Sequence, residues 1–173
     1  MRSCVLLVFC SGVLLAESVA GLKWTPPAGW KSSGTTSMRA ATYPVAPSPG
    51  DSAAGECAVY FFGPGQGGTV QANLDRWGGQ FKDAVGKPAP TKVAKVTIHG
   101  MPVTTIDVSG QYSGMAGPQA TTPASAPGYR LLGAIVEGPS GNVFIKFTGP
   151  SKTVAANQGR FQQLLDSFDK GSK

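Results

Sequence analysis

The sequence predicts an α+β fold, in which a central antiparallel sheet of about six to seven strands carries two main helices. Several short segments alternate in the two-residue period of a strand. Two other segments, near residues 70–81 and 151–168, space their apolar residues along one face of a helix. Short connections join the last four predicted strands, and such connections require antiparallel pairing.

The N-terminal segment has the layout of a secretory signal peptide. Arg2 precedes an apolar run over residues 5–16, and the small-residue pattern SVA ends at Ala20. No later segment has the roughly 20 apolar residues that a membrane-spanning helix needs. We therefore expect cleavage near Ala20 to remove residues 1–20. Residues 21–173 then form one secreted or periplasmic domain without a membrane span.

Cysteine content and charge narrow the choice of partners. After cleavage only Cys57 remains, so an internal disulfide is excluded and a buried thiol is expected, with intermolecular pairing or reactivity as the alternatives. Lipidation at Cys10 is disfavoured because the bulky Val8 and Phe9 precede it. The formal net charge of +6 favours an anionic ligand. The basic residues are scattered along the chain, so no nucleic-acid partner is expected.

Three strands open the predicted domain, over residues 22–24, 37–45 and 56–62. A turn with two prolines follows the first strand, and a Pro/Gly/Ser-rich loop precedes the third. The third strand has apolar residues on both faces, so both faces should be covered. One face carries Cys57, Val59 and Phe61, and the other carries Ala58, Tyr60 and Phe62.

A helix is predicted after the glycine-rich loop that ends the third strand. Thr69 can cap its N-terminus. Its buried stripe consists of Val70, Leu74, Trp77 and Phe81. The prolines at positions 88 and 90 end any continuation.

Two hairpins supply the next four strands. Residues 92–98 and 101–109 alternate around His99-Gly100, a connection short enough for a tight turn. The second hairpin joins residues 129–137 to 142–148, and its last strand carries Val143, Ile145 and Phe147 on one side and Lys146 on the other. In the first hairpin, the pairs Ile98 with Met101 and Val96 with Val103 should share the core face. Between the hairpins, residues 113–128 lack periodicity and charge, which predicts a flexible loop.

A terminal helix closes the predicted domain. Ser151 can cap it after Gly149-Pro150, and Gly171 lies past its end. Its apolar stripe consists of Val154, Phe161, Leu164, Leu165 and Phe168. We expect this stripe to close the core over the sheet.

The element order, the opening WTPPAGW at residues 24–30 and the closing helix resemble the PsbP-like fold. That fold occurs in an extrinsic photosystem II subunit, a Ran-binding import factor and bacterial envelope proteins. The resemblance covers nearly all of residues 21–173. It implies a central antiparallel sheet between helices and a noncatalytic binding or assembly role. Because members bind unrelated partners, it transfers no binding residue.

No catalytic or metal centre is expected from the sequence. His99 is the only histidine and lies at a predicted turn, and Cys57 lies within a strand without an evident base nearby. One histidine and one distant cysteine are too few for a zinc site, and the carboxylates lack the spacing of a calcium loop. We therefore expect no enzyme and no cofactor.

Two regions are candidate binding sites. The turn Gly65-Gln66-Gly67-Gly68 before Thr69 can direct backbone amides at an anion, although the turn contains no lysine or arginine and can be a flexible connection only. Trp30, with Trp24 and Tyr43, can stack on a sugar or contact a partner. Core packing is the alternative, and we expect it for at least two of these three residues and for Trp77.

These observations favour a noncatalytic secreted or periplasmic binding or assembly module whose partner is an envelope or secreted protein. The alternative is a binding protein for a small molecule, an anion or a glycan.

Overall fold

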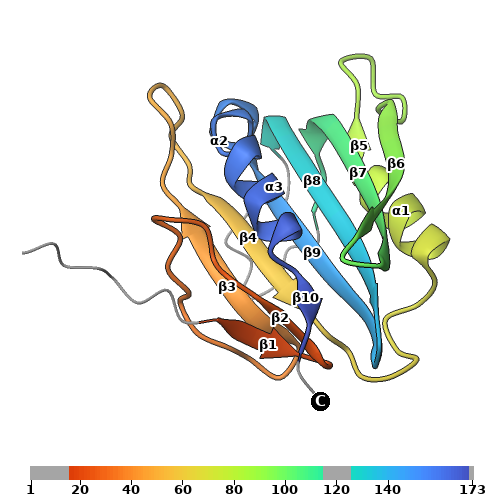
Figure 1. Ribbon diagram of the computed structural model, residues 1–173. Coiled ribbons are helices and arrows are strands. Elements are labelled where there is room, and N and C mark those ends of the chain that lie inside the picture. Colours follow the sequence, from red (N-terminus) through yellow and green to blue (C-terminus); the bar gives the residue numbers. More distant parts are fainter. Residues whose placement is uncertain (1–15, 115–125, 172–173) are drawn as a thin grey trace, which may run out of the picture.

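The main sheet of the computed structural model, which describes residues 16–114 and 126–171, has seven antiparallel strands (Figure 1). Its order is β3-β4-β9-β8-β7-β5, and β6 also pairs with β7. The predicted α+β class and antiparallel sheet are confirmed. The strands are β3 (Arg39–Val45), β4 (Gly55–Tyr60), β5 (Phe81–Lys82), β6 (Thr91–Ile98), β7 (Met101–Tyr112), β8 (Ala126–Gly138) and β9 (Gly141–Pro150).

A second sheet brings the two ends of the described chain together. It contains β1 (Glu17–Val19), β2 (Leu22–Trp24) and β10 (Asp169–Lys170) in the order β1-β2-β10. The sequence predicted only β2 of these three. Strand β1 comes from the segment predicted to be the leader.

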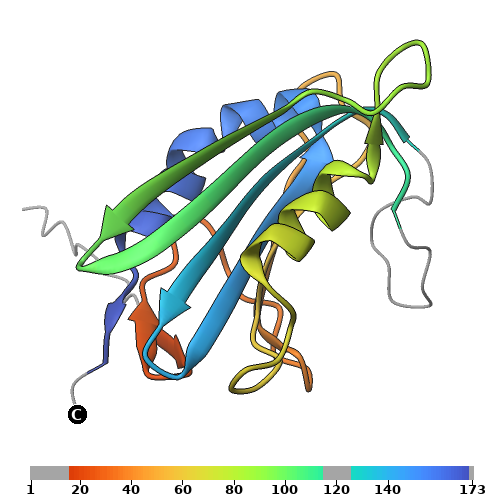
Figure 2. The same ribbon diagram turned by 90° about the vertical axis from the view of Figure 1, so that its right-hand side faces the viewer.

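The helices lie on opposite faces of the main sheet (Figure 2). Helix α1 (Val70–Gly78) is on one face, and α2 (Ser151–Ala156) and α3 (Gln158–Asp166) are on the other. The Thr69 cap is confirmed, because its hydroxyl accepts a hydrogen bond of 3.1 Å from the amide of Ala72. Phe81 was assigned to this helix wrongly: it lies in β5, although it is fully buried beside α1's core residues.

The terminal helix is broken into two. The Asn157 side chain donates to the carbonyl of Thr153 at 2.9 Å, and the backbone leaves helical geometry at Asn157, with φ at −108°. The predicted cap by Ser151 is wrong, since its side chain makes no capping bond. Asp51, from a distant loop, instead accepts bonds from the amide and hydroxyl of Thr153.

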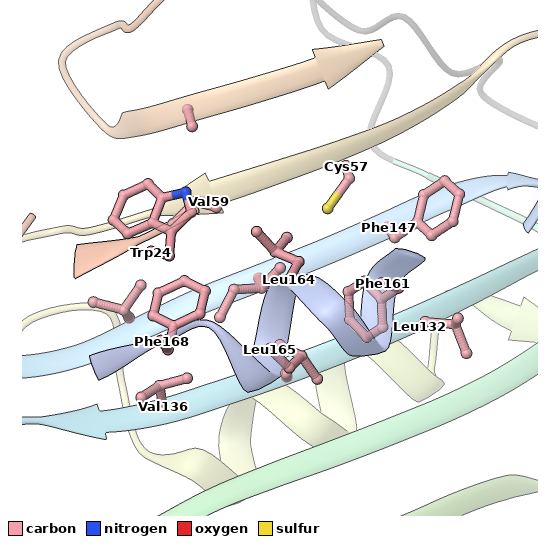
Figure 3. Close-up of a cluster of buried hydrophobic side chains, with 14 of the residues drawn as sticks. Trp24, Cys57, Val59, Leu132, Val136, Phe147, Phe161, Leu164, Leu165 and Phe168 are labelled. Carbon is pink, nitrogen blue, oxygen red and sulfur yellow. The ribbon is translucent and has the colours of Figure 1, made fainter. Parts of the chain in front are cut away.

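Two apolar clusters fill the two faces of the main sheet. Figure 3 shows the larger one, in which Phe161, Leu164 and Leu165 of α3 lie over the strands. Trp24 stacks on Phe168 in this cluster, with ring centroids 5.0 Å apart. The whole apolar stripe predicted for the terminal helix is buried, as is the Cys57 thiol, so both predictions are confirmed. The smaller cluster lies under α1.

The predicted turn between β6 and β7 is confirmed. His99 and Gly100 have φ values of 46° and 73°, the left-handed geometry of a tight two-residue hairpin turn. The register pairs Val96 with Val103 as predicted, but Val96 is 45% exposed instead of buried. It lies on an edge strand, where no helix covers it.

The second hairpin is also confirmed, with Gly138 opposite Gly141. Residues 115–125 of the loop predicted over 113–128 lie outside the described residues. Positions 126–128 belong to β8, so the predicted loop extends three residues too far at its C-terminal end.

In the described part of the chain, no helix has the length and apolar character needed to cross a bilayer.

Candidate functional site

A pocket of about 310 Å³ opens beside α1, on its face of the sheet. Strand β4 and the residues after it supply two aromatic rings, α1 and the residues after it supply three side chains, and β9 supplies one lysine. The lining residues are Tyr60, Phe62, Arg76, Trp77, Gln80 and Lys146.

Small residues create the room for this pocket. Lys146 lies in the sheet between Ala58 on β4 and Gly133 on β8, its partners in the strand register. A Cβ atom on Gly133 would lie 2.7 Å from the Trp77 ring, so only glycine allows the ring to pack this close to β8. Lys146 thus has a small neighbour on each side, and Trp77 lies next to it.

Aromatic rings form one wall of the pocket. Tyr60 and Phe62 stack with their centroids 6.0 Å apart and an angle of 9° between the rings. The Arg39 guanidinium lies 5.3 Å from the centroid of Tyr60, in the geometry of a cation–π contact. The prediction that both faces of this strand are covered is wrong here, because Tyr60 is half-buried and Phe62 is 36% exposed.

Lys146 is the half-buried cation of the pocket. Its Nζ atom donates to Gln80 Oε1 at 2.9 Å and lies 5.6 Å from the centroid of the Tyr112 ring. Its pKa is lowered to about 8, chiefly by loss of hydration and also by the positive charges of Arg76 and Arg39, while the charge of Glu56 acts in the opposite direction. Near neutral pH, Lys146 therefore stays charged in a place that disfavours its charge.

Two carboxylates near this pocket, those of Glu56 and Asp75, have partners outside its lining. Glu56 pairs with Arg39 at 2.9 Å, and Asp75 accepts a hydrogen bond from Gln71. Arg76 donates to Asn73, a neutral side chain. The six lining residues include two cations and no carboxylate. This arrangement can hold an anionic group against Lys146 and Arg76, and an apolar body against the rings.

The predicted glycine turn lies between β4 and α1 and does not line the pocket. The Gln66 amide bonds to the Gly63 carbonyl at 3.1 Å. Asn73 donates to the carbonyls of Gly67 and Thr69 at 2.8 and 2.9 Å. The loop is thus held by its own residues and by the first turn of α1. Anion binding by Gly65, Gln66, Gly67, Gly68 and Thr69 stays a prediction.

Trp30 lies on the opposite face of the sheet and is 6% exposed. Its ring packs on Tyr43 and edge-on against Phe147, at 5.8 and 5.4 Å. Trp24 and Tyr43 are buried as well, so the expected core packing is confirmed for all three residues. Trp77, at 5% exposed, is confirmed in the core too. A separate pocket of about 250 Å³ adjoins Trp30, Asn157 and Arg160.

Cys57 and His99 are the two side chains considered for catalysis. Cys57 is buried, and His99 contacts a backbone carbonyl. Burial raises the pKa of the Cys57 thiol, and the charge of Glu56 raises it further, which disfavours a thiolate. His99 Nδ1 lies 2.7 Å from the carbonyl oxygen of Phe168. Within residues 16–114 and 126–171, no group of three or more His, Cys, Asp or Glu residues is placed to hold a metal ion.

No protein-family model matches the sequence, and no curated protein is similar to it at a significant level. The α+β architecture is shared with solved structures. One is the crystal structure of PA94, a protein of unknown function from Pseudomonas aeruginosa, with a TM-score of 0.51 and 11% identity over 92% of this chain and 98% of that one. Such low identity supports a common fold only.

The chain is also similar to the solution structure of cyanobacterial PsbP (CyanoP) from Synechocystis sp. PCC 6803. The TM-score is 0.49, with 12% identity over 95% of this chain and 98% of the other. The element order that supported the PsbP-like resemblance is present in the structure, with the short strands β1, β5 and β10 added. A PsbP protein is thus among the structures that this chain resembles.

Sequence reasoning placed Lys146 on the face opposite Val143, Ile145 and Phe147, and this is confirmed. It did not identify the pocket. The available signal was the lysine itself, in the apolar strand segment VFIKF.

Proposed function

We propose that this chain is a noncatalytic binding module that holds an anionic ligand with an apolar body in the Lys146 pocket. The observation that carries the proposal is a half-buried lysine whose charge is disfavoured by its surroundings, in a pocket lined by no carboxylate. A bound carboxylate or phosphate would supply the missing counter-charge, since opposite charges a few ångströms apart stabilise each other strongly in a partly desolvated site.

The shape of the pocket supports a small ligand. Its volume is at the lower end of the range typical of small-molecule sites. Among its lining rings, Phe62 is exposed and Trp77 is buried. We infer an anionic group attached to a short apolar or aromatic body.

The proposal includes export and the absence of catalysis. The leader pattern supports a secreted or periplasmic location after cleavage near Ala20. The buried Cys57 and the carbonyl-bonded His99 support a role without a nucleophile or general base. Mass spectrometry of the exported chain tests the location: a protein beginning at Gly21 is expected, and an uncleaved chain retained in the cell would contradict it.

Ligand screening by thermal unfolding tests the binding site. Aromatic and aliphatic carboxylates and phosphates are compared with the matching neutral amides and alcohols. A ligand at 100 times its dissociation constant stabilises the native state by about 2.7 kcal/mol, which raises the melting temperature by roughly 5 to 10 °C in a domain of this size. The anions should do this and the neutral analogues should not.

Two variants test whether stabilisation by anions depends on the Lys146 pocket. Lys146→Gln should remove the response to anions, whereas Lys152→Gln, which changes an exposed lysine on α2, should leave it intact. Equal responses to anions and neutral analogues, or an unchanged response in the Lys146 variant, would refute the proposed site.

Binding of a protein partner from the envelope or the secreted fraction is the second candidate function, and the exposed edge strand β6 favours it.

A further inference from the structure

One edge of the main sheet concentrates both charge and exposed apolar side chains. This β5–β6 edge, defined as residues 81–98, contains four lysines and one aspartate, so it carries +3 of the chain's formal net charge of +6. In the described part of the chain, five large hydrophobic residues are exposed, and three of them lie here. They are Val85, Val93 and Val96, at 77%, 48% and 45% exposure.

Strand β6 is the regular part of this edge, at the right of Figure 1. All eight of its residues pair with β7 without a register shift, and among the described residues no other strand pairs with β6. Every residue except Ile98 is exposed. An edge of this kind presents unpaired backbone donors and acceptors to which another strand can bind.

We propose that β6 binds an extended acidic segment of a partner protein as an added antiparallel strand. The register with β7 places Val93 and Lys95 on the α1 face, and Lys92 and Val96 on the face of α3. Side chains directly opposite each other on paired strands interact. The bound segment therefore carries, in chain order, an apolar, an acidic, any, an apolar and an acidic residue.

A second copy of this chain fits the edge less well. Pairing β6 with itself would bring together Lys92 and Lys95 from both copies, and β6 contains no carboxylate to offset them. Lysines on an edge strand protect proteins against such self-association. The same lysines attract an acidic strand, so charge selects the class of partner.

A labelled peptide with two repeats of the five-residue pattern tests the proposal by fluorescence anisotropy with the full folded domain. Two control peptides are matched to it. In one, lysines replace the acidic residues; in the other, alternate backbone nitrogens are methylated so that they cannot donate to β6. The acidic peptide should bind at least tenfold more tightly than either control.

Charge reversal on the protein completes the test. The Lys92→Glu/Lys95→Glu variant should lose at least tenfold in affinity for the acidic peptide and gain affinity for the lysine peptide. The variant Lys31→Glu/Lys152→Glu has the same net charge, changes two exposed lysines elsewhere, and should bind like the wild type. Tight binding of the methylated peptide would show charge attraction without strand pairing and overturn the proposal. Failure of the acidic peptide to bind at millimolar concentration would also overturn the proposal. It would indicate that the lysines of β6 only protect the edge against association.

The test is independent of the ligand pocket. Neither lysine of β6 lines the Lys146 pocket, so loss of peptide binding and loss of anion binding are separate results.

Discussion

Replacing Lys146 with methionine should stabilise the domain at neutral pH. In the native state the pKa of Lys146 is about 8, against 10.5 for an unperturbed lysine. At about 1.4 kcal/mol for each pH unit, this gap corresponds to about 3 kcal/mol by which the charged lysine lowers the free energy of unfolding. Methionine keeps a similar length and loses the charged hydrogen bond to Gln80, which contributes about 2 kcal/mol. The expected net gain at pH 7 is about 1 kcal/mol.

The pH dependence provides a sharper test, because its sign follows from proton linkage. Between pH 8 and pH 10.5, unfolded chains keep the Lys146 proton while native chains have lost it. The unfolded state thus binds more protons, and the contribution of Lys146 makes the wild-type domain more stable as pH rises through this window. Below pH 8 the destabilisation is fully present. The advantage of Lys146→Met should therefore be largest near pH 7 and disappear by about pH 10.5.

Urea unfolding followed by tryptophan fluorescence, at pH 7 and at pH 10, measures this difference between the two proteins. Lys152→Met is the matched control, since Lys152 is exposed on α2 and should show no such pH dependence. A Lys146→Met variant that is less stable than wild type at pH 7, or whose advantage does not change with pH, would show that Lys146 is not held in a desolvated site.

Three further predictions follow from the packing. Gly133→Ala should destabilise the domain by about 1 to 3 kcal/mol, because the new Cβ would lie 2.7 Å from the Trp77 ring; an unchanged urea midpoint would contradict the close packing. Cys57 should resist thiol reagents in native buffer and react in urea, which mass spectrometry can follow, and rapid native labelling would show that the thiol is accessible. Deleting everything after Pro150 should leave an unfolded or aggregating chain, since each large buried side chain of the lost segment contributes about 1.5 to 3 kcal/mol against a total stability of about 5 to 15 kcal/mol. A cooperative melt of this truncated chain by circular dichroism would mean that the terminal helices are not needed for folding.

The long strands of the main sheet could be predicted from the sequence because their signal is local. Alternating or continuous apolar segments marked β3, β4 and β6 to β9, and the turn at His99-Gly100 fixed the register of the first hairpin. The short strands β1, β5 and β10 have two or three residues each, too few for a period. β10 pairs with β2 from the other end of the chain, a contact that no local pattern indicates.

In the terminal helices, too, some features follow from a repeating sequence pattern and others depend on individual side-chain contacts. The apolar stripe was predicted correctly because burial at helical spacing is visible in the sequence. The break at Asn157 depends on a side-chain bond to Thr153, and the cap depends on Asp51, which is about 100 residues away. Asp51, which is distant in sequence, thus caps the helix in place of Ser151.

The pocket depends on which part of a sheet face a helix leaves uncovered, and this is a tertiary property. Alternation placed Tyr60 and Phe62 on one face of β4, but the sequence could not show that α1 packs toward Gly133 and leaves these rings at an opening. Lys146 was the exception, because it interrupts a strand that is apolar on both sides. In the structure β9 lies between β4 and β8, so this lysine cannot reach solvent past a sheet edge. A charge at such a position must be compensated by its surroundings or by a ligand. In the described structure, Lys146 directly contacts the neutral Gln80 and the Tyr112 ring. Glu56 acts on it through its charge but pairs with Arg39, so we favour the ligand.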